Sequence, residues 1–155
     1  MNCAAAEENT PEPALELTGR VVDAADILSA SAETRLLRTL DELEHDTGIQ
    51  IVVATTPDLK GRDIADYSLE LANAWGVGSE ETDDGLLLLV APNERKVRIE
   101  VGYGLEASVR DEEAAEIIRG RIIPRFKEAD YDRGVIDAVT ELVFEVTPVS
   151  MKEAA

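Results

Sequence analysis

The sequence has almost none of the residues that build disulfides or soft-metal sites. Cysteine and histidine each occur once in 155 residues, as Cys3 and His45. A single cysteine excludes an internal disulfide and a Cys-based zinc site, and a single histidine excludes a His-rich metal site. His45 lies at the end of a predicted helix, where the helix dipole favours a cation, and this ordinary role accounts for it.

Hydrolase signatures, long apolar runs and an excess of positive charge are also lacking. The chain has no G-x-S-x-G elbow and no phosphate-cradling P-loop. No apolar run approaches the roughly 20 residues that a membrane-spanning helix needs. With 33 acidic and 15 basic side chains, the formal net charge is −18. Such a field repels nucleic acid and concentrates cations, so we expect no nucleic-acid partner, although the same acidity also suits a protein that needs only solubility.

Composition divides the chain into three parts. Residues 1–17 are rich in Ala, Glu and Pro and are expected to be a disordered lead-in, residues 18–147 form one α/β domain, and residues 148–155 form a flexible tail. The lead-in lacks the charged and apolar segments of a signal peptide. Cys3 is followed by small and polar residues, as at the start of a mature lipoprotein. A lipid anchor on Cys3 is therefore our hypothesis for any membrane contact.

Apolar periodicity predicts alternating helices and strands. One helix follows Ser29, a suitable N-cap, and stops at Gly48, and a second covers residues 63–75. Two more are predicted, one capped by Asp111 and one beginning near Asp132. Strand patterns occupy four segments, residues 19–28, 49–56, 86–90 and 97–101. We expect a three-layer α/β fold with a mixed sheet of about four strands and helices on both faces.

The last two predicted strands form a hairpin whose open end gathers polar residues. Leu86–Val90 is continuously apolar, and Ala91–Lys96 supplies the turn. If Leu86 faces Val101, the segment before the first strand lies beside the segment after the second. These segments are Asp83-Asp84-Gly85 and Gly102-Tyr103-Gly104-Leu105-Glu106.

The second of these segments also matches a dinucleotide-binding pattern. Gly102, Gly104 and Ala107 occupy the three positions of G-x-G-x-x-A after a strand. We reject a nucleotide site because the preceding strand is the antiparallel arm, and because Glu106 would confront a pyrophosphate. The glycines suit a tight turn instead, and four residues are assigned as loop-shaping: Gly85, Gly102, Tyr103 and Gly104.

Four carboxylates are predicted to meet near the open end, and they suggest a hard cation. They are Asp83, Asp84, Glu106 and Asp111. Carboxylates that share a site repel one another unless a cation or protons neutralise them, and Ca²⁺ favours mixed oxygen ligands on flexible loops. The alternative assigns the aspartates to a turn and a helix cap and Glu106 to solvent. Asp23 and Asp26 could supply a catalytic carboxylate, but their spacing does not select them.

Several segments, taken in order, resemble the TPM-domain family of bacterial envelope and thylakoid-lumen proteins. They are Gly19–Asp23 with Leu28-Ser29, Gly48–Val53, Asp84–Val90, Arg95–Glu106, and Ile123–Phe126 with Asp130-Tyr131. The resemblance spans about residues 17–144 and implies a Rossmann-like fold. It also implies Ca²⁺ binding by acidic loop residues, and acid phosphatase activity as in some plant members.

The family's acidic loop positions correspond to Asp23, Asp84, Glu106 and Asp111 of this chain. Asp83 is the less secure ligand, because family members often carry Asn where this chain has Asp83 or Asp84. Many members also have a C-terminal membrane helix and a Gly-rich tail, and neither pattern occurs here.

Three hypotheses follow, in this order. The first is a monomeric Ca²⁺-binding accessory domain, periplasmic or otherwise extracytoplasmic, that acts through an unidentified envelope protein. The second is a metal-assisted acid phosphatase that uses the same pocket. The third is a protein-interaction module without metal.

Overall fold

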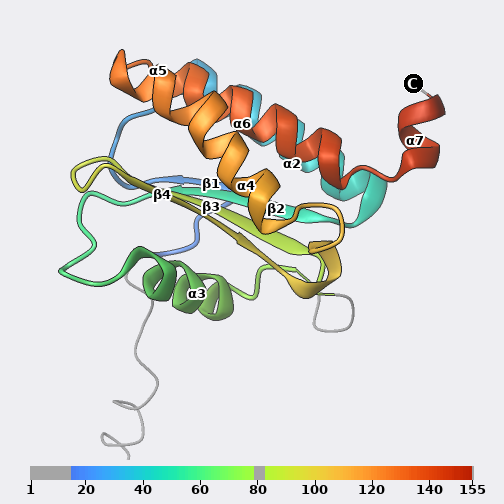
Figure 1. The fold of residues 1–155 in the computed structure, drawn as a ribbon, viewed down its shortest axis with the longest axis horizontal. Helices are drawn as coiled ribbons and strands as arrows, with labels where there is room; N and C mark the ends of the chain where they lie inside the picture. Colours follow the sequence, from blue (N-terminus) through green and yellow to red (C-terminus); the bar gives the residue numbers. More distant parts are fainter. Residues whose placement is uncertain (1–14, 79–82, 155) are drawn as a thin grey trace, which may run out of the picture.

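A four-stranded mixed sheet forms the centre of the molecule (Figure 1). The computed structural model describes residues 15–78 and 83–154. The strands are β1 (Val21–Asp23), β2 (Gln50–Thr55), β3 (Gly85–Ala91) and β4 (Lys96–Val101), and they lie in the order β1-β2-β3-β4. The first three are parallel and β4 is antiparallel to β3, so the predicted mixed sheet is confirmed. Cys3 and most of the predicted lead-in lie outside the described residues.

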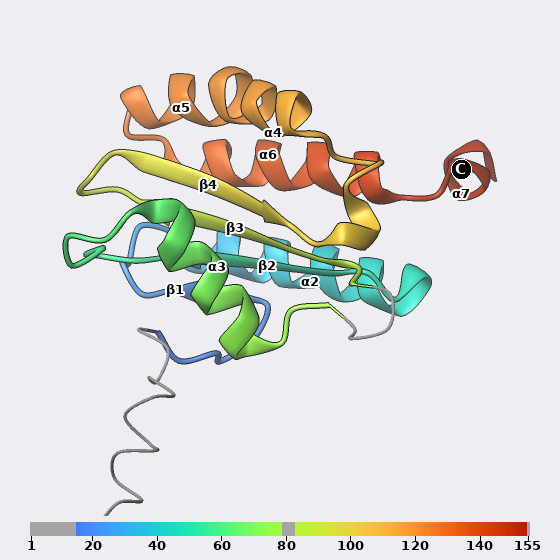
Figure 2. The ribbon, with the colours of Figure 1, turned by 60° about the horizontal axis from the view of Figure 1, so that its bottom comes forward.

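Helices cover both faces of this sheet, which confirms the three predicted layers. They are α2 (Ala30–Thr47), α3 (Ile64–Trp75), α4 (Asp111–Ile117), α5 (Ile123–Lys127), α6 (Tyr131–Val146) and α7 (Val149–Ala154), with a short 3₁₀ turn η1 (Tyr103–Leu105) and a π-helical turn η2 (Ile118–Ile122). Figures 1 and 2 show α3 alone on one face and α2, α4, α5 and α6 on the other.

The capping residues explain where the first two helices begin and stop. The Ser29 hydroxyl accepts a hydrogen bond from the Ala32 N–H at 3.1 Å. The α2 helix ends at Gly48, whose φ of 80° is the left-handed conformation that glycine adopts without strain. In the same way, α3 starts after Asp63 and ends at Gly76. The ends of α2 and the stop of α3 are the ones that the sequence predicts, and α3 starts one residue later than predicted.

The start of α4 differs from the prediction. Asp111 is the first helical residue and not the N-cap, which is Arg110. The reason is the Glu113 side chain, whose Oε1 reaches back and accepts the Arg110 N–H at 3.1 Å. The helical path continues through Pro124, because the π turn η2 widens the chain just before it and Pro124 lies in the first turn of α5.

The two faces of the sheet bury separate apolar clusters. Every residue of β3 is buried, as the continuous apolar run predicts. On one face, Leu88 and Ile51 pack among the apolar residues of α2, α4 and α6. On the other, Leu87 and Val52 pack against Leu71 of α3 and its neighbours. Because β3 is buried on both sides, it fixes the position of the loops at its two ends.

The last helices complete the α2 side. The α6 helix starts at Tyr131, one residue before the predicted start, because Asp130 caps it by accepting the Arg133 N–H at 3.2 Å. Its Val135, Val139 and Leu142 are buried. The α7 helix lies within the part predicted to be a flexible tail. Across residues 15–78 and 83–154, no helix combines the length and apolarity that crossing a membrane requires.

Candidate functional site

The open end of the β3–β4 hairpin brings the two predicted loops together. Leu86 pairs with Val101, which is the register that the sequence predicts. One step further, the Gly102 N–H donates to the Gly85 carbonyl at 2.8 Å, and the Gly104 N–H donates to the Asp83 carbonyl at 3.0 Å. The segments before β3 and after β4 are therefore joined by backbone hydrogen bonds.

Asp83 and two glycines make this junction tight. Asp83 has a φ of 50°, and its Oδ2 accepts the Tyr103 N–H at 3.1 Å. A Cβ on Gly102 would lie 2.4 Å from the Asp83 carbonyl oxygen, and one on Gly85 would lie 2.5 Å from the Gly78 nitrogen. Neither position has room for a side chain. This geometry explains why glycine occupies both positions.

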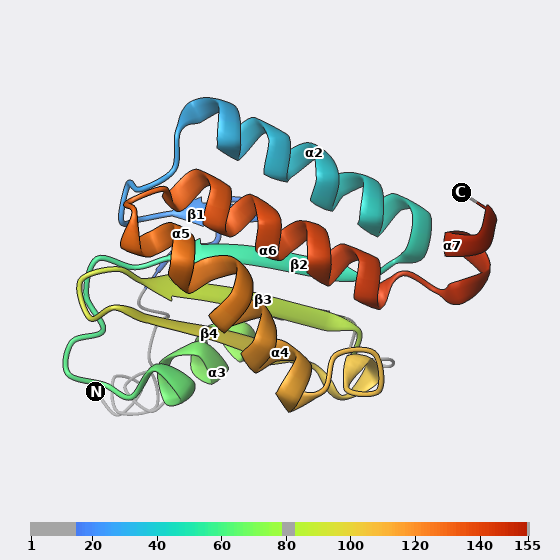
Figure 3. The same ribbon diagram turned by 45° about the horizontal axis from the view of Figure 1, so that its top comes forward.

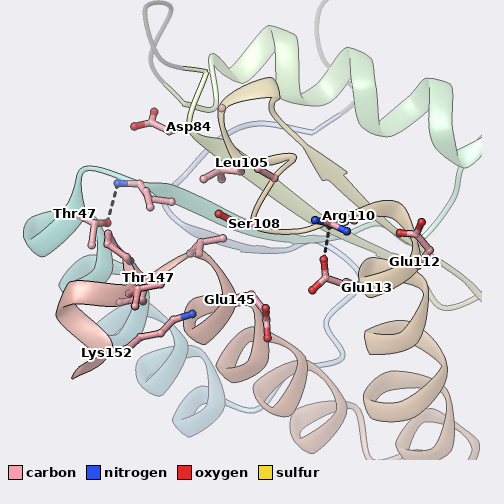
Figure 4. Close-up of a pocket in the computed structure, with 16 residues that line it drawn as sticks. Thr47, Asp84, Leu105, Ser108, Arg110, Glu112, Glu113, Glu145, Thr147 and Lys152 are labelled. Atoms are coloured by element: carbon pink, nitrogen blue, oxygen red, sulfur yellow. Dashed lines mark hydrogen bonds between the residues drawn. The ribbon is translucent and has the colours of Figure 1, made fainter. Parts of the chain in front are cut away.

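An open pocket of about 830 Å³ lies beside the junction (Figure 4). Asp84 and Leu105 line it from the hairpin loops, Arg110 and Glu113 from the start of α4, and Glu145 from the end of α6. Lys152 of α7 and Thr47 of α2 also contribute. The pocket thus joins elements from the middle and the end of the chain.

Like charges on α4 and α6 face this pocket. Burial raises the pKa of the Glu145 carboxyl above its ordinary value, and so do its hydrogen bond with Glu141 and the nearby charge of Glu113. Lys152 opposes the rise, because a neighbouring cation favours the ionised carboxylate. Figure 4 shows Glu145 between Glu113 of α4 and Lys152 of α7. The Glu145 carboxyl therefore holds its proton more tightly than the carboxyl of an isolated glutamate does.

The predicted acidic ligands do not all face the same space. Asp84 lines the large pocket, whereas Asp83, Glu106 and the exposed Tyr103 line a smaller cavity of about 200 Å³ beneath α3. Asp111 is exposed in the first turn of α4 and lines neither space. The hairpin end therefore divides three of the four predicted carboxylates between two sides, and Asp111 lies at neither.

Asp23 lies at the opposite end of the sheet. It pairs with Thr55, five residues along β2 from Gln50, which pairs with Gly85. At about 3.3 Å per residue, some 16 Å of strand separates the two positions. Both Asp23 carboxylate oxygens are engaged: Oδ1 accepts the Ile27 N–H at 3.1 Å and the Thr55 hydroxyl at 2.7 Å, and Oδ2 accepts the Leu28 N–H at 2.9 Å. The prediction that Asp23 joins the acidic site is wrong, since the register places it elsewhere and it holds the β1–α2 loop.

The available donors match a hard cation in type but do not form a cage. Ca²⁺ takes six to eight oxygen ligands, and carboxylates and carbonyls are what this end of the hairpin offers. Among the described residues, no group of three or more Asp, Glu, His or Cys side chains is placed to hold a metal ion. The residues fit a cation held by a few protein oxygens and water, and they do not fit a four-carboxylate site.

Sequence reasoning missed the C-terminal half of the large pocket. Glu145 and Lys152 reach it because α6 ends near the hairpin end and α7 follows directly after it (Figure 3). No local pattern reports that proximity. The spacing of Arg110 and Glu113 could have indicated where α4 begins, since a Glu three residues after an N-cap is half of a capping box.

A sequence profile of the TPM domain matches residues 21–144. No curated protein matches the chain. The solution NMR structure of the N-terminal domain of a protein from P. gingivalis is 34% identical, with a TM-score of 0.77, covering 83% of this chain and 82% of that one.

Two more distant structures share the fold. The N-terminal domain of the cg2496 protein from Corynebacterium glutamicum is 17% identical with a TM-score of 0.65, covering 85% of this chain and 82% of that one. The BA42 protein from the psychrophilic bacterium Bizionia argentinensis is 19% identical with a TM-score of 0.66, covering 77% of this chain and 81% of that one.

Proposed function

Because the chain belongs to the TPM domain family, we propose that it is an extracytoplasmic binding domain that takes up Ca²⁺ at the open end of the β3–β4 hairpin. The observation that supports this most directly is the Asp83-Asp84 turn. Asp83 is held in a left-handed conformation, with its carbonyl bonded to Gly104 and its Oδ2 bonded to Tyr103. Asp83 is thus fixed on this turn, where it lines the smaller cavity, and the adjacent Asp84 lines the large pocket.

Charge and donor type both favour a hard divalent cation. The net charge of −18 raises the local concentration of cations around the whole molecule. Ca²⁺ accepts irregular sets of oxygen ligands completed by water, whereas Mg²⁺ requires near-octahedral geometry. With few protein carboxylates, the site belongs to the weak class of extracellular calcium modules, with a Kd of roughly 10⁻⁴–10⁻³ M. The domain then acts through a protein of the cell envelope that recognises the loaded hairpin end.

We do not propose phosphate ester hydrolysis as the main activity. A nucleophilic carboxylate needs an oxygen that is available to attack phosphorus. Asp23, one of the two carboxylates considered for catalysis, has both oxygens engaged in hydrogen bonds to the β1–α2 loop and Thr55.

The test is a Ca²⁺ titration followed by backbone NMR and thermal unfolding. NaCl at matched ionic strength is the reference, because screening alone stabilises so acidic a protein. We expect saturable shifts at Gly85, Gly102 and Gly104 and a higher Tm with Ca²⁺ than with NaCl, since a ligand that binds only the folded state stabilises it by mass action.

The matched variants locate the effect. Asp83→Asn together with Asp84→Asn should remove the specific shifts, whereas Asp41→Asn, an exposed change on α2, should leave them unchanged. Identical responses to Ca²⁺ and NaCl would reject the cation site. Chelator-sensitive hydrolysis of an aryl phosphate, lost in the double variant, would instead establish the phosphatase hypothesis.

A further inference from the structure

A second cavity, of about 450 Å³, lies at the closed end of the hairpin, away from the carboxylates. We propose that it binds a small amphipathic anion, an organic molecule that joins one carboxylate, phosphate or sulfonate group to an apolar body. The end of β3, the β3–β4 turn and the start of β4 line one side. The α5 helix and the start of α6 line the other (Figure 3).

Apolar side chains line this cavity on both sides. Val90 and Val97 line the sheet side, and Ile123, Phe126 and Tyr131 line the helix side. The Phe126 and Tyr131 rings meet edge to face, with centroids 4.9 Å apart and planes at 67°.

The Phe126 ring is also held against α6 by Gly134. A Cβ on Gly134 would lie 2.7 Å from the Phe126 ring, so glycine allows this close approach. A cavity with fixed aromatic walls and this volume is within the usual range for small-molecule sites.

Three cationic side chains line the same cavity: Arg95, Lys96 and Lys127. Within the described residues, none of the three forms an ion pair. By contrast, Arg121 and Arg125 on the neighbouring helical turns pair with acidic residues.

The nearby acidic side chains are directed to other partners. Glu94 Oε2 accepts the Leu59 N–H at 2.9 Å, Asp130 caps α6, and Glu128 lies 4.0 Å from Arg125. A cluster of unpaired positive charge is unusual on a chain of net charge −18. It complements an anion.

The backbone at Arg95 supports a role for its side chain. Its φ is 57°, in the left-handed region, which costs a non-glycine residue of order 1 kcal/mol. Glycine or asparagine would satisfy this turn position at lower cost. The presence of arginine at a strained position is explained if the guanidinium binds a ligand.

The combination of walls and charges selects the class of ligand. A free inorganic anion would leave the aromatic and aliphatic wall unused, and a neutral hydrocarbon would leave three cations without partners. The volume suits one small molecule and not a folded partner. This inference does not depend on the cation site, which lies at the other end of β3.

The test uses a fluorescent probe of matching chemistry. We expect 8-anilinonaphthalene-1-sulfonate to bind saturably with one-to-one stoichiometry, and to shift the backbone NMR signals of Val90, Val97 and Tyr131. N-phenyl-1-naphthylamine, which lacks the sulfonate, and inorganic phosphate should each bind at least about tenfold more weakly, since one charged contact is worth that much.

Two variants separate binding from folding. Arg95→Gly should lower probe affinity about tenfold while stability towards urea stays equal or rises, because the strained position is relieved. Lys127→Ala should lower affinity without loss of stability, and Arg38→Ala on α2 is the control that should change neither. Unchanged affinity in the Arg95→Gly and Lys127→Ala variants, equal binding of the neutral analogue, or NMR shifts elsewhere would each overturn the proposal.

Discussion

Gly102→Ala tests the central claim that the hairpin end is a tightly packed junction. The added Cβ would lie 2.4 Å from the Asp83 carbonyl oxygen and 2.9 Å from both Asp83 Oδ1 and the Gly85 carbonyl oxygen. Two of these three contacts are to backbone atoms, which move only if the junction opens. Overpacking costs about 1–3 kcal/mol, and losing the Gly102–Gly85 hydrogen bond costs about 1 kcal/mol more.

The expected loss in unfolding free energy is therefore about 2–4 kcal/mol, a large share of the total stability of a domain of this size. With a urea m-value of about 2 kcal/mol/M, the unfolding midpoint should fall by about 1–2 M. Urea unfolding followed by circular dichroism measures this shift. The Ca²⁺ response should weaken in parallel, because Asp83 loses its fixed position.

Gly120→Ala is the matched control. A Cβ there would meet nothing within 4 Å, and Gly120 lies in the helical turn η2. Alanine should leave stability unchanged or raise it by up to about 1 kcal/mol. If Gly102→Ala unfolds within about 0.5 kcal/mol of the natural protein, the close approach does not limit this junction and the packing argument fails.

Three further changes test other parts of the structure. Asp23→Ala should cost about 2–4 kcal/mol in urea unfolding, since two N–H groups and one hydroxyl lose their acceptor; a negligible cost would mean that the β1–α2 loop does not depend on Asp23. Ser29→Ala should cost about 1 kcal/mol through loss of the α2 N-cap, which Ser29→Asp should restore. Glu145→Gln should stabilise the fold at neutral pH and have little effect well below pH 4.5. The raised pKa of Glu145 means that the folded state binds its proton more tightly than the unfolded state. Stability is therefore lost as pH rises from 4.5 through the raised pKa. Urea unfolding over a pH series tests this. If the Glu145→Gln variant is no more stable than the natural protein at neutral pH, the reasoning is contradicted.

Local signals predicted most of the secondary structure. Ser29 and Gly48 mark the two ends of α2, because a hydroxyl N-cap starts a helix and a left-handed glycine stops it through contacts within a few residues. The hairpin register was also predictable, because the turn length and the alternation of Val97, Ile99 and Val101 leave one arrangement that buries the apolar face. The predicted N-cap of α4, Asp111, was wrong. The Glu113 side chain accepts the Arg110 N–H, so Arg110 is the N-cap and the helix starts at Asp111.

The candidate site was only half predictable. The hairpin joins Asp83 to Gly102–Glu106 through contacts that follow from one turn, so the sequence alone indicated that junction. Glu145 and Lys152 join it through the packing of α6 and α7, which no local pattern encodes. Asp23 shows the converse error, since the family resemblance suggested a shared site that the strand register does not allow.

By itself, then, the sequence determined the longer helices, the mixed sheet and the glycine junction, because capping, alternation and turn geometry are short-range effects. Only the tertiary structure decided which charges share a space. Parallel pairing of β1, β2 and β3 sends Asp23 to the opposite end from Asp84. Packing of α5 against the hairpin turn brings Lys127 to Arg95 and Lys96. Both outcomes depend on contacts between residues distant in the chain, and the energy of such contacts is set by packing of the whole core.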